Sequence, residues 1–415
     1  MLACVQGQQS RYYLEHGVIA AEIHSPTFHR MKAVESCIRT LFPRKDWTSS
    51  AVVTIMSRWI VPLNTPMGLG NDSVALLDLG CILNDDRLLL EGRKRHLATV
   101  QALRRELQRP KIAFEGVHAT ALDLLFCEVY RPVASVLDSE TWTRHLAGLS
   151  AVMKISERQP DSQISGSWLS LLYGQMDLMH ALVHRRPMLF GEGSLRSNVR
   201  TAYPGSVDVL FQLSARLPLL LQATDRLCVA GSEDHNEQAR IRQSLLHLED
   251  PLFCWLTKFK PSTAVLKACA APPSETTSEP LAFDSYFEGM ALNFYWVNKL
   301  LIAQCLLDLK GWLPSEPAGG ESSTGQDLAG EAERFASLLC RSIPSMAESC
   351  GGMISKGLAM RAPLHFAGRW YERSGYAKGL EWCKDVECQL RGEMAWLNWD
   401  ALLPWSFVAL LWLER

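Results

Sequence analysis

Apolar residues recur every three or four positions along most of the chain, which is the spacing of an amphipathic helix. The clearest example lies between Asp86 and Gln108, where Arg, Lys and Glu separate a series of apolar residues. The series is Leu90, Leu97, Val100, Leu103 and Leu107. We expect these side chains to form one buried stripe on a helix that stops at Pro110. Alternation with period two, which indicates strands, never persists for more than a few residues.

The same pattern predicts further helices, several of them bounded by proline. They are Val117–Tyr130, Ser139 to about Arg158, Trp168–His184, Ser206–Leu227 with an interruption at Pro218, Asn236–Leu248, Phe283–Leu309, Glu331–Leu339, Pro363–Tyr371, Tyr376–Leu390 and Trp405–Leu413. The stretch 270–280 is predicted to be a loop, and 311–327 a flexible surface loop, from their Pro, Gly, Ser and Thr content. We therefore expect an all-α fold, a large irregular helical domain of antiparallel packed helices, formed by residues 1–415 together.

Composition and charge narrow the possible functions. The chain has 415 residues and a formal net charge of −2, whereas a dedicated nucleic-acid binder needs a clustered basic face. The run Arg93–His96 is either a weak nuclear signal or, as we favour, a solvated helix face. The apolar stretch Ala401–Leu413 is interrupted by Pro404 and is shorter than the roughly 20 residues of a membrane span. No secretory signal is visible at the N-terminus. We expect neither direct nucleic-acid contact nor membrane contact.

The 12 cysteines are scattered rather than paired. A zinc cluster needs thiols at short, repeated spacing, and only Cys383 and Cys388 approach that spacing, without a second pair. Four cysteines stand among apolar residues and are predicted to be small buried hydrophobes: Cys81, Cys127, Cys254 and Cys340. Such thiols suit a reducing compartment.

Several polar groupings have a structural interpretation that we prefer. Asp177, His180 and His184 share one helical face, but the glutamate of a zincin motif is missing and no further ligand can be named. Trp142 and His145 are three residues apart and share one helical face. We expect Trp142 to pack and the ring of His145 to hydrogen-bond a neighbouring backbone group, rather than His145 to carry a proton. In Asn84-Asp85-Asp86, either aspartate would cap the next helix. We predict no metal site and no cofactor, because phosphate-loop and dinucleotide motifs are absent from the sequence.

The C-terminal part offers a candidate ligand pocket. Tryptophans alternate there with polar residues, an arrangement that lines apolar ligand pockets but also serves core packing. The candidate ligand-binding residues are His365, Arg369, Trp370, Trp382, Trp396 and Trp399. Asn293 and Asn298 join them because they interrupt an apolar helix, where a buried amide must bond either another helix or a bound molecule. No catalytic residue can be named.

The order of the helices and their local sequences resemble the fungal-specific transcription factor domain. This is the helical regulatory region found C-terminal to a zinc binuclear cluster in fungal regulators. The likeness covers roughly residues 70–310. It is carried by Ser73–Gly80, Leu122–Tyr130, the Trp-x-x-His-Leu-x-Gly segment Trp142–Gly148, and Trp168–Pro187. The six cysteines of the cluster are missing.

The resemblance implies a transcription-regulator-like effector domain without its own DNA-binding module. Such a protein would act in the nucleus or cytoplasm through protein partners, with a small-molecule ligand as a possible signal. The alternative is an enzyme or small-molecule binding protein of fungal secondary metabolism that uses the same fold. The sequence does not specify the oligomeric state.

Overall fold

The computed structural model describes residues 62, 65–109, 112, 114–130, 139–157, 168–190, 205–230, 234–263, 265, 280–310, 323–350, 353–395 and 398–407. All regular structure in these residues is helical, which confirms the all-α fold. The α-helices are α4 (Pro66–Leu83), α5 (Asp86–Glu106), α6 (Phe114–Cys127), α7 (Ser139–Glu157), α8 (Trp168–His184), α10 (Val207–Ser214), α11 (Leu217–Ala230), α12 (His235–Phe259), α14 (Tyr286–Lys310), α15 (Ser323–Ser349), α16 (Met353–Ser374) and α17 (Ala377–Glu393). Two 3-10 helices, η1 (Glu128–Tyr130) and η4 (Asp400–Trp405), complete the set.

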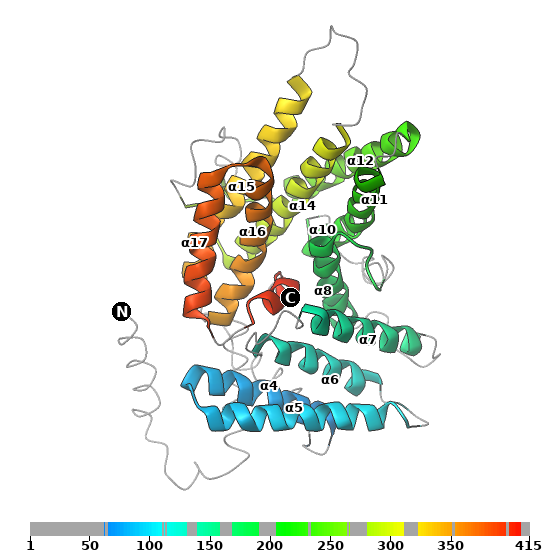
Figure 1. Ribbon diagram of the computed structural model, residues 1–415, viewed down its shortest axis with the longest axis vertical. Helices are drawn as coiled ribbons and strands as arrows, with labels where there is room; N and C mark the ends of the chain where they lie inside the picture. Colours follow the sequence, from blue (N-terminus) through cyan, green and yellow to red (C-terminus); the bar gives the residue numbers. More distant parts are fainter. Residues whose placement is uncertain are drawn as a thin grey trace.

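The helices form an elongated stack (Figure 1). Helices α4 and α5 make one end of the stack, and α6, α7 and α8 follow above them. Helices α10–α12 and the bundle α14–α17 form two arms at the other end. The C-terminal η4 packs in the middle against α8, α7 and α16. It is held there in part by the backbone of Asn398, whose N–H donates to the carbonyl of Val129 at 2.7 Å.

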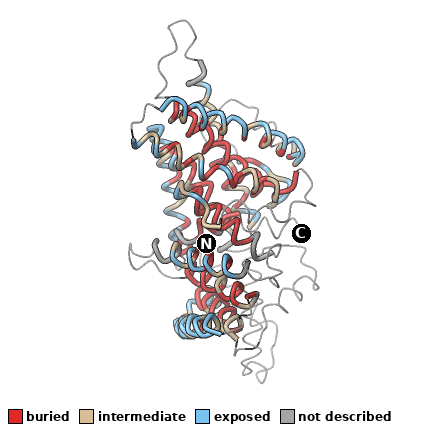
Figure 2. Tube along the Cα trace, turned by 90° about the vertical axis from the view of Figure 1, so that its right-hand side faces the viewer, coloured by how far each residue is buried: buried red, intermediate tan, exposed pale blue. Residues whose placement is uncertain are grey.

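Helix α14 is the central element of the core. Every residue from Glu288 to Leu306 is buried, and α14 packs against α11, α12 and α15. Figure 2 shows the buried residues running through the inside of the stack. A helix that is apolar on all sides belongs in such a position. Among the residues that the structure describes, the span Tyr286–Leu309 alone is long and apolar enough to cross a membrane, and it is almost entirely enclosed by the fold.

The side of helix α5 that packs against the rest of the protein is not the predicted one. Leu90, Leu97, Val100 and Leu107 are exposed, and Leu103 is half-buried, so the prediction of one buried stripe is wrong. Small residues cause the difference, because they let α4 and α5 approach closely.

The close approach is visible at two glycines. A Cβ on Gly92 would lie 2.8 Å from the Cγ of Leu77, and a Cβ on Gly80 would lie 2.9 Å from the backbone nitrogen of Leu89. The hydroxyl of Ser73 donates to the carbonyl of Gly92 at 2.9 Å. Helix α5 therefore turns Gly92 and Thr99 inward rather than Leu90, Leu97 and Leu107.

The turn between α4 and α5 follows the sequence signals. Asn84 adopts a left-handed conformation with φ 52° and ends α4. The carboxylate of Asp85 accepts hydrogen bonds from the backbone N–H groups of Arg87 and Leu88, at 2.8 and 3.4 Å. Asp85 is thus the N-cap of α5 and is one of the two aspartates predicted for this role.

Three helices run longer than proline positions suggest. Helices α12, α15 and α16 continue through Pro251, Pro344 and Pro363. In α12 the buried side chains of Leu252 and Trp255 extend the inner face beyond the proline, so that packing outweighs the lost hydrogen bond.

Further local boundaries also differ. The break predicted at Pro218 falls at residues 215–216, and Pro218 sits in the first turn of α11, where a missing N–H costs little. Helix α15 begins at Ser323, so the predicted loop 311–327 ends earlier; its residues 311–322, and most of 270–280, lie outside the described residues.

Cys81, Cys127 and Cys340 are buried as predicted, but Cys254 is exposed because Trp255 takes the inner face of α12.

Candidate functional site

A half-open cleft of about 500 Å³ lies where four helices meet that are far apart in sequence. The end of α8, one position of α11, the C-terminal half of α14 and the C-terminal half of α16 form its walls. The lining residues are Leu182, Val183, Arg185, Asp225, Leu301, Gln304, Asp308, His365, Phe366, Arg369, Glu372 and Arg373. Its volume falls in the range of sites for small molecules.

Arg185 enters this cleft because of an unusual backbone conformation. It follows the last residue of α8 with φ 49°, the left-handed region in which glycine is favoured. The N–H of Arg186 donates back to the carbonyl of Ala181 at 3.1 Å and closes the helix end. The turn sends the two neighbouring arginines apart: Arg185 goes to the cleft, whereas Arg186 contacts Thr143 and His180. A non-glycine residue in this conformation costs on the order of 1 kcal/mol, which the contacts of Arg185 must offset.

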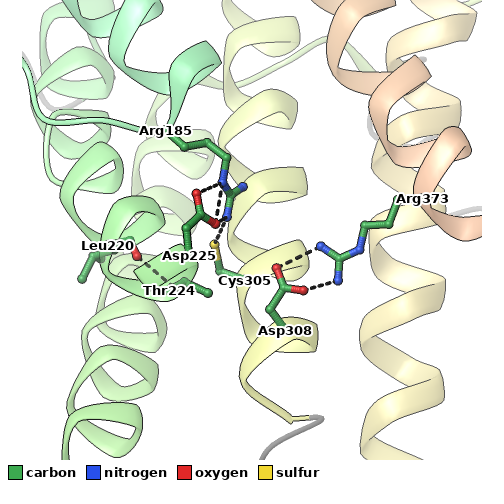
Figure 3. A network of polar contacts seen from close by, with 7 residues as sticks. All are labelled: Arg185, Leu220, Thr224, Asp225, Cys305, Asp308 and Arg373. Atoms are coloured by element: carbon green, nitrogen blue, oxygen red, sulfur yellow. Dashed lines mark hydrogen bonds and ion pairs between the residues drawn. The ribbon is translucent and has the colours of Figure 1, made fainter. Parts of the chain in front are cut away.

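The guanidinium of Arg185 is anchored on two helices (Figure 3). Its Nε lies 2.9 and 2.8 Å from the two carboxylate oxygens of Asp225 on α11, and its Nη2 lies 2.7 Å from Oδ1. The same Nη2 donates to the Sγ of Cys305 on α14 at 3.6 Å. Burial alone would lower the pKa of Arg185, but the hydrogen bond and charge of Asp225 raise it. Burial raises the pKa of the Cys305 thiol to about 11, against the opposing effect of Arg185. The guanidinium is therefore charged and Cys305 is a neutral thiol.

A second ion pair joins α14 to α16 on the other side of the cleft (Figure 3). Both guanidinium Nη atoms of Arg373 donate to the carboxylate of Asp308, Nη1 at 2.9 Å. This bidentate geometry is the strong form of an arginine–carboxylate contact. Arg369, one turn earlier on α16, has a looser partner, because its Nη1 lies 3.4 Å from Glu372 on the same helix and both side chains are largely exposed.

His365 is the neutral member of the site. It is half-buried on α16, with its ring edge-on to Phe366. Burial lowers the pKa of its imidazole to about 3, and the positive charges of Arg361, Arg369 and His184 act in the same direction. The ring is therefore uncharged at neutral pH, where it can donate or accept a hydrogen bond.

The charges of the lining balance. Three arginines face three carboxylates, Asp225, Asp308 and Glu372, so the cleft has no formal net charge. Leu182, Val183, Leu301 and Phe366 add apolar surface. Such a cleft suits a small molecule that carries both charge signs and an apolar part, because each charged group finds an opposite partner without a net field.

The structure brings two of the sequence-predicted residues into this cleft, His365 and Arg369. The tryptophans with described side chains lie elsewhere. Trp370 is buried on the α15 side and donates its indole N–H to Glu333 at 2.8 Å. Trp399 donates to Glu387 at 2.9 Å, with the guanidinium of Arg361 5.5 Å above its ring.

Trp382 packs, half-buried, against the hydrophobic core, and Trp396 lies outside the described residues. Trp370 and Trp399 thus pack between helices and bond carboxylates, whereas Trp382 only packs against the core. Their predicted role in ligand binding stays a prediction.

Asn293 and Asn298 are buried in α14 and do not line the cleft. The Nδ2 of Asn298 donates to the carbonyl of Phe294, one turn back in the same helix, at 2.7 Å. Neither polar atom of the Asn293 side chain has a hydrogen-bond partner among the described residues. A buried amide of this kind is usually satisfied by an ordered water.

The earlier polar groupings have structural roles. Asp177 accepts a hydrogen bond from the backbone N–H of Phe190 at 2.8 Å, and the rings of His180 and His184 lie 4.5 Å apart. No group of three or more His, Cys, Asp or Glu side chains in the described part of the chain could hold a metal ion. The Nε2 of His145 lies 3.6 Å from Glu128, and the side chain of Trp142 lies outside the described residues.

Sequence reasoning missed most of the charged residues of the cleft. Arg185 directly follows the predicted helix Trp168–His184 and was not singled out. Asp225 and Asp308 were available as signals, because each stands in a mainly apolar helix. Their partners could not be read from the sequence, since each ion pair joins residues at least 40 positions apart.

Comparison with family models, with curated proteins and with solved structures finds no match to this chain.

Proposed function

We propose that the chain is a regulatory helical domain that binds a small zwitterionic metabolite in this cleft and acts through protein partners. The observation that carries the proposal is the cleft itself, with equal numbers of cationic and anionic side chains beside an apolar surface. The resemblance to the fungal-specific transcription factor domain supports the regulatory part.

The loosest ion pair of the site indicates where the ligand head group would bind. Arg185 and Arg373 each bind a carboxylate on another helix through more than one contact, so both arginines stabilise helix packing. Among the described residues, Arg369 and Glu372 form ion pairs only with each other, one helical turn apart and near solvent. A ligand carboxylate would bind Arg369 and a ligand ammonium group would bind Glu372, which replaces one exposed pair by two better bonded ones. The adjacent imidazole of His365 would bond either group without adding charge.

The apolar lining selects the rest of the ligand. Leu182, Leu301 and Phe366 would contact an aliphatic or aromatic part. The class of ligand that fits best is therefore an amino acid or a similar zwitterion with an apolar side chain. Because the walls belong to α8 and α11 on one side and α14 and α16 on the other, binding would hold the two sets of helices together. That change is the signal that a partner would detect.

Calorimetric titration tests the head-group assignment with three matched compounds. Leucine carries both charges, 4-methylpentanoate lacks the ammonium group, and 3-methylbutylamine lacks the carboxylate. We expect leucine, or another apolar amino acid of a small panel, to bind at least tenfold more tightly than either single-charge analogue, as roughly expected when a charge-assisted bond is lost. At a hundred times its Kd, such a ligand would raise Tm by about 3 °C for 415 residues.

Two variants locate the binding. Arg369→Gln should weaken it about tenfold or more, because it removes the cation for the carboxylate. Arg240→Gln is the matched control, since Arg240 also pairs with a glutamate three residues away on an exposed helix face, Glu237, but lies outside the cleft. Equal affinity for all three compounds, or equal loss in both variants, would contradict the proposal. Chemical conversion of the bound compound would favour the enzyme alternative.

A further inference from the structure

The outer face of α5 carries an apolar stripe that is exposed to solvent. Leu90 is 54% exposed, Leu97 63%, Val100 41% and Leu107 37%. Helix α5 lies at one end of the stack, with α4 on its inner side and its other face outward (Figure 1). Single exposed leucines are ordinary, but four on one helical line form a surface that indicates an interaction site.

The spacing of the stripe fits a partner helix. Leu90 and Leu97 are seven residues apart, Val100 follows after three, and Leu107 after another seven. These are the core positions of a heptad repeat. At 1.5 Å per residue the stripe is about 26 Å long, the length of a helix of about 18 residues. A line of this width is the seam of a coiled coil rather than the broad apolar face of a helix that lies on a membrane.

The charge around the stripe indicates an acidic partner. Helix α5 has six Lys and Arg residues and three Asp and Glu residues. Two of its acidic residues already form ion pairs. Glu91 pairs with Lys94 and Arg95, and Glu106 pairs with Arg109. Arg93 and Arg104 occupy the remaining heptad core positions between the apolar residues. No ion pair joins either of them to another described residue.

A second copy of this chain fits the stripe less well. In an antiparallel pair of α5 helices, Leu90 would face Leu107 of the other copy and Leu97 would face Val100. The same register would place Arg93 against Arg104 of the other copy, twice per dimer. Like charges in a seam are unfavourable, whereas acidic residues would satisfy both arginines.

We propose that the exposed face of α5 is a docking surface for an amphipathic helix of another protein, with leucine-like residues at heptad spacing and Asp or Glu beside them. The partner helix packs against Leu90, Leu97, Val100 and Leu107, and its acids pair with Arg93 and Arg104. This surface is separate from the cleft, so its test does not depend on a ligand.

Fluorescence anisotropy of labelled peptides with the full chain tests the surface. One 28-residue peptide has Leu at both heptad core positions and Glu at the flanking positions, and a second has Lys in place of Glu. We expect the acidic peptide to bind at roughly micromolar concentration and the basic peptide to bind about tenfold more weakly or worse. Higher salt should weaken the binding of the acidic peptide.

Two double variants separate the apolar and charged contributions. The double variant Leu90→Glu with Leu97→Glu should bind the acidic peptide at least about tenfold more weakly. Arg93→Glu with Arg104→Glu should reverse the preference and favour the basic peptide, a result that general damage to the fold cannot produce. Leu246→Glu is the matched control, because Leu246 is 48% exposed on α12, away from the stripe, and its variant should bind as wild type does.

Several results would overturn the proposal. One is equal binding of both peptides, or binding that neither double variant changes. Another is a wild-type dimer in sedimentation velocity that Leu97→Glu dissociates, which would make a second copy the occupant. A third is binding to phosphatidylserine vesicles through the stripe without peptide binding. A last one is hydrogen exchange showing that residues 1–61 of the chain cover α5, with no peptide bound.

Discussion

Replacement of Gly92 by alanine tests the packing that turns the face of α5. In an isolated helix, Gly→Ala is stabilising by about 1 kcal/mol. At Gly92 the added Cβ would lie 2.8 Å from Cγ, 3.0 Å from Cδ2 and 3.1 Å from the backbone nitrogen of Leu77. Leu77 is buried, and its backbone cannot move aside without shifting α4.

The net effect follows from these opposing contributions. Overpacking a buried contact costs about 1–3 kcal/mol. Separating the helices also weakens the 2.9 Å hydrogen bond from Ser73 to the Gly92 carbonyl, which is worth about 1 kcal/mol. After subtraction of the helix-propensity gain, Gly92→Ala should destabilise the α4–α5 pair by at least about 1 kcal/mol.

Hydrogen exchange measured by mass spectrometry is the appropriate assay, because it reports the local stability of α4 and α5. The slow amides of both helices should exchange at least about 5 times faster in Gly92→Ala. Gly148→Ala on the exposed side of α7 is the control, since no atom lies within 4 Å of its added Cβ. That variant should be stabilised by about 0.5–1 kcal/mol. If both variants gained stability, α5 would not pack through Gly92, and the exposed stripe would no longer follow.

Three further predictions concern the charged and thiol groups. In a double-mutant cycle by denaturant unfolding, Arg185→Ala and Asp225→Ala should show a coupling of about 1–2 kcal/mol, because the pair is only partly exposed; additive effects would contradict the ion pair. Burial raises the pKa of Asp78 to about 7, so the stability lost through its ionisation is lost between the unfolded pKa of about 4 and that value; Asp78→Asn should raise Tm by roughly 1–3 °C at pH 8 and hardly at pH 4. Among the described thiols, Cys254 and Cys388 should react fastest with a thiol reagent in the native protein, as peptide mapping would show, since they are the exposed ones.

Helix positions were largely predictable from the sequence, because helical periodicity and caps are local. The limits of α8 were predicted to the residue, and the cap of α5 was narrowed to two neighbouring aspartates, of which Asp85 is the cap. The inward face of α5 was not predictable in the same way. Apolar periodicity identifies the stripe, but the choice between leucines and Gly92 depends on the neighbouring helix. Proline positions misled for a related reason, since the packing of Leu252 and Trp255 keeps α12 helical beyond Pro251.

The candidate site was predictable only in part. His365 and Arg369 stand one turn apart on α16, so both could be assigned to one helix face from sequence alone. The ion pairs of Arg185 and Arg373 join distant helices, and their partners follow only from the fold. Tryptophan content pointed to a pocket, yet Trp370 and Trp399 use their indole N–H groups to bond carboxylates between helices. Residue type indicated that buried aromatic surface was present, but not which cavity it bordered.

The most direct test of the proposed ligand site is hydrogen exchange of the full chain with and without a saturating apolar amino acid selected by calorimetry. We predict slower exchange at the end of α8 near Arg185, in α11 around Asp225 and in α16 from His365 to Arg373, with α5 unchanged. Protection confined to other helices, or no protection with any zwitterion that binds, would contradict the assignment of the cleft.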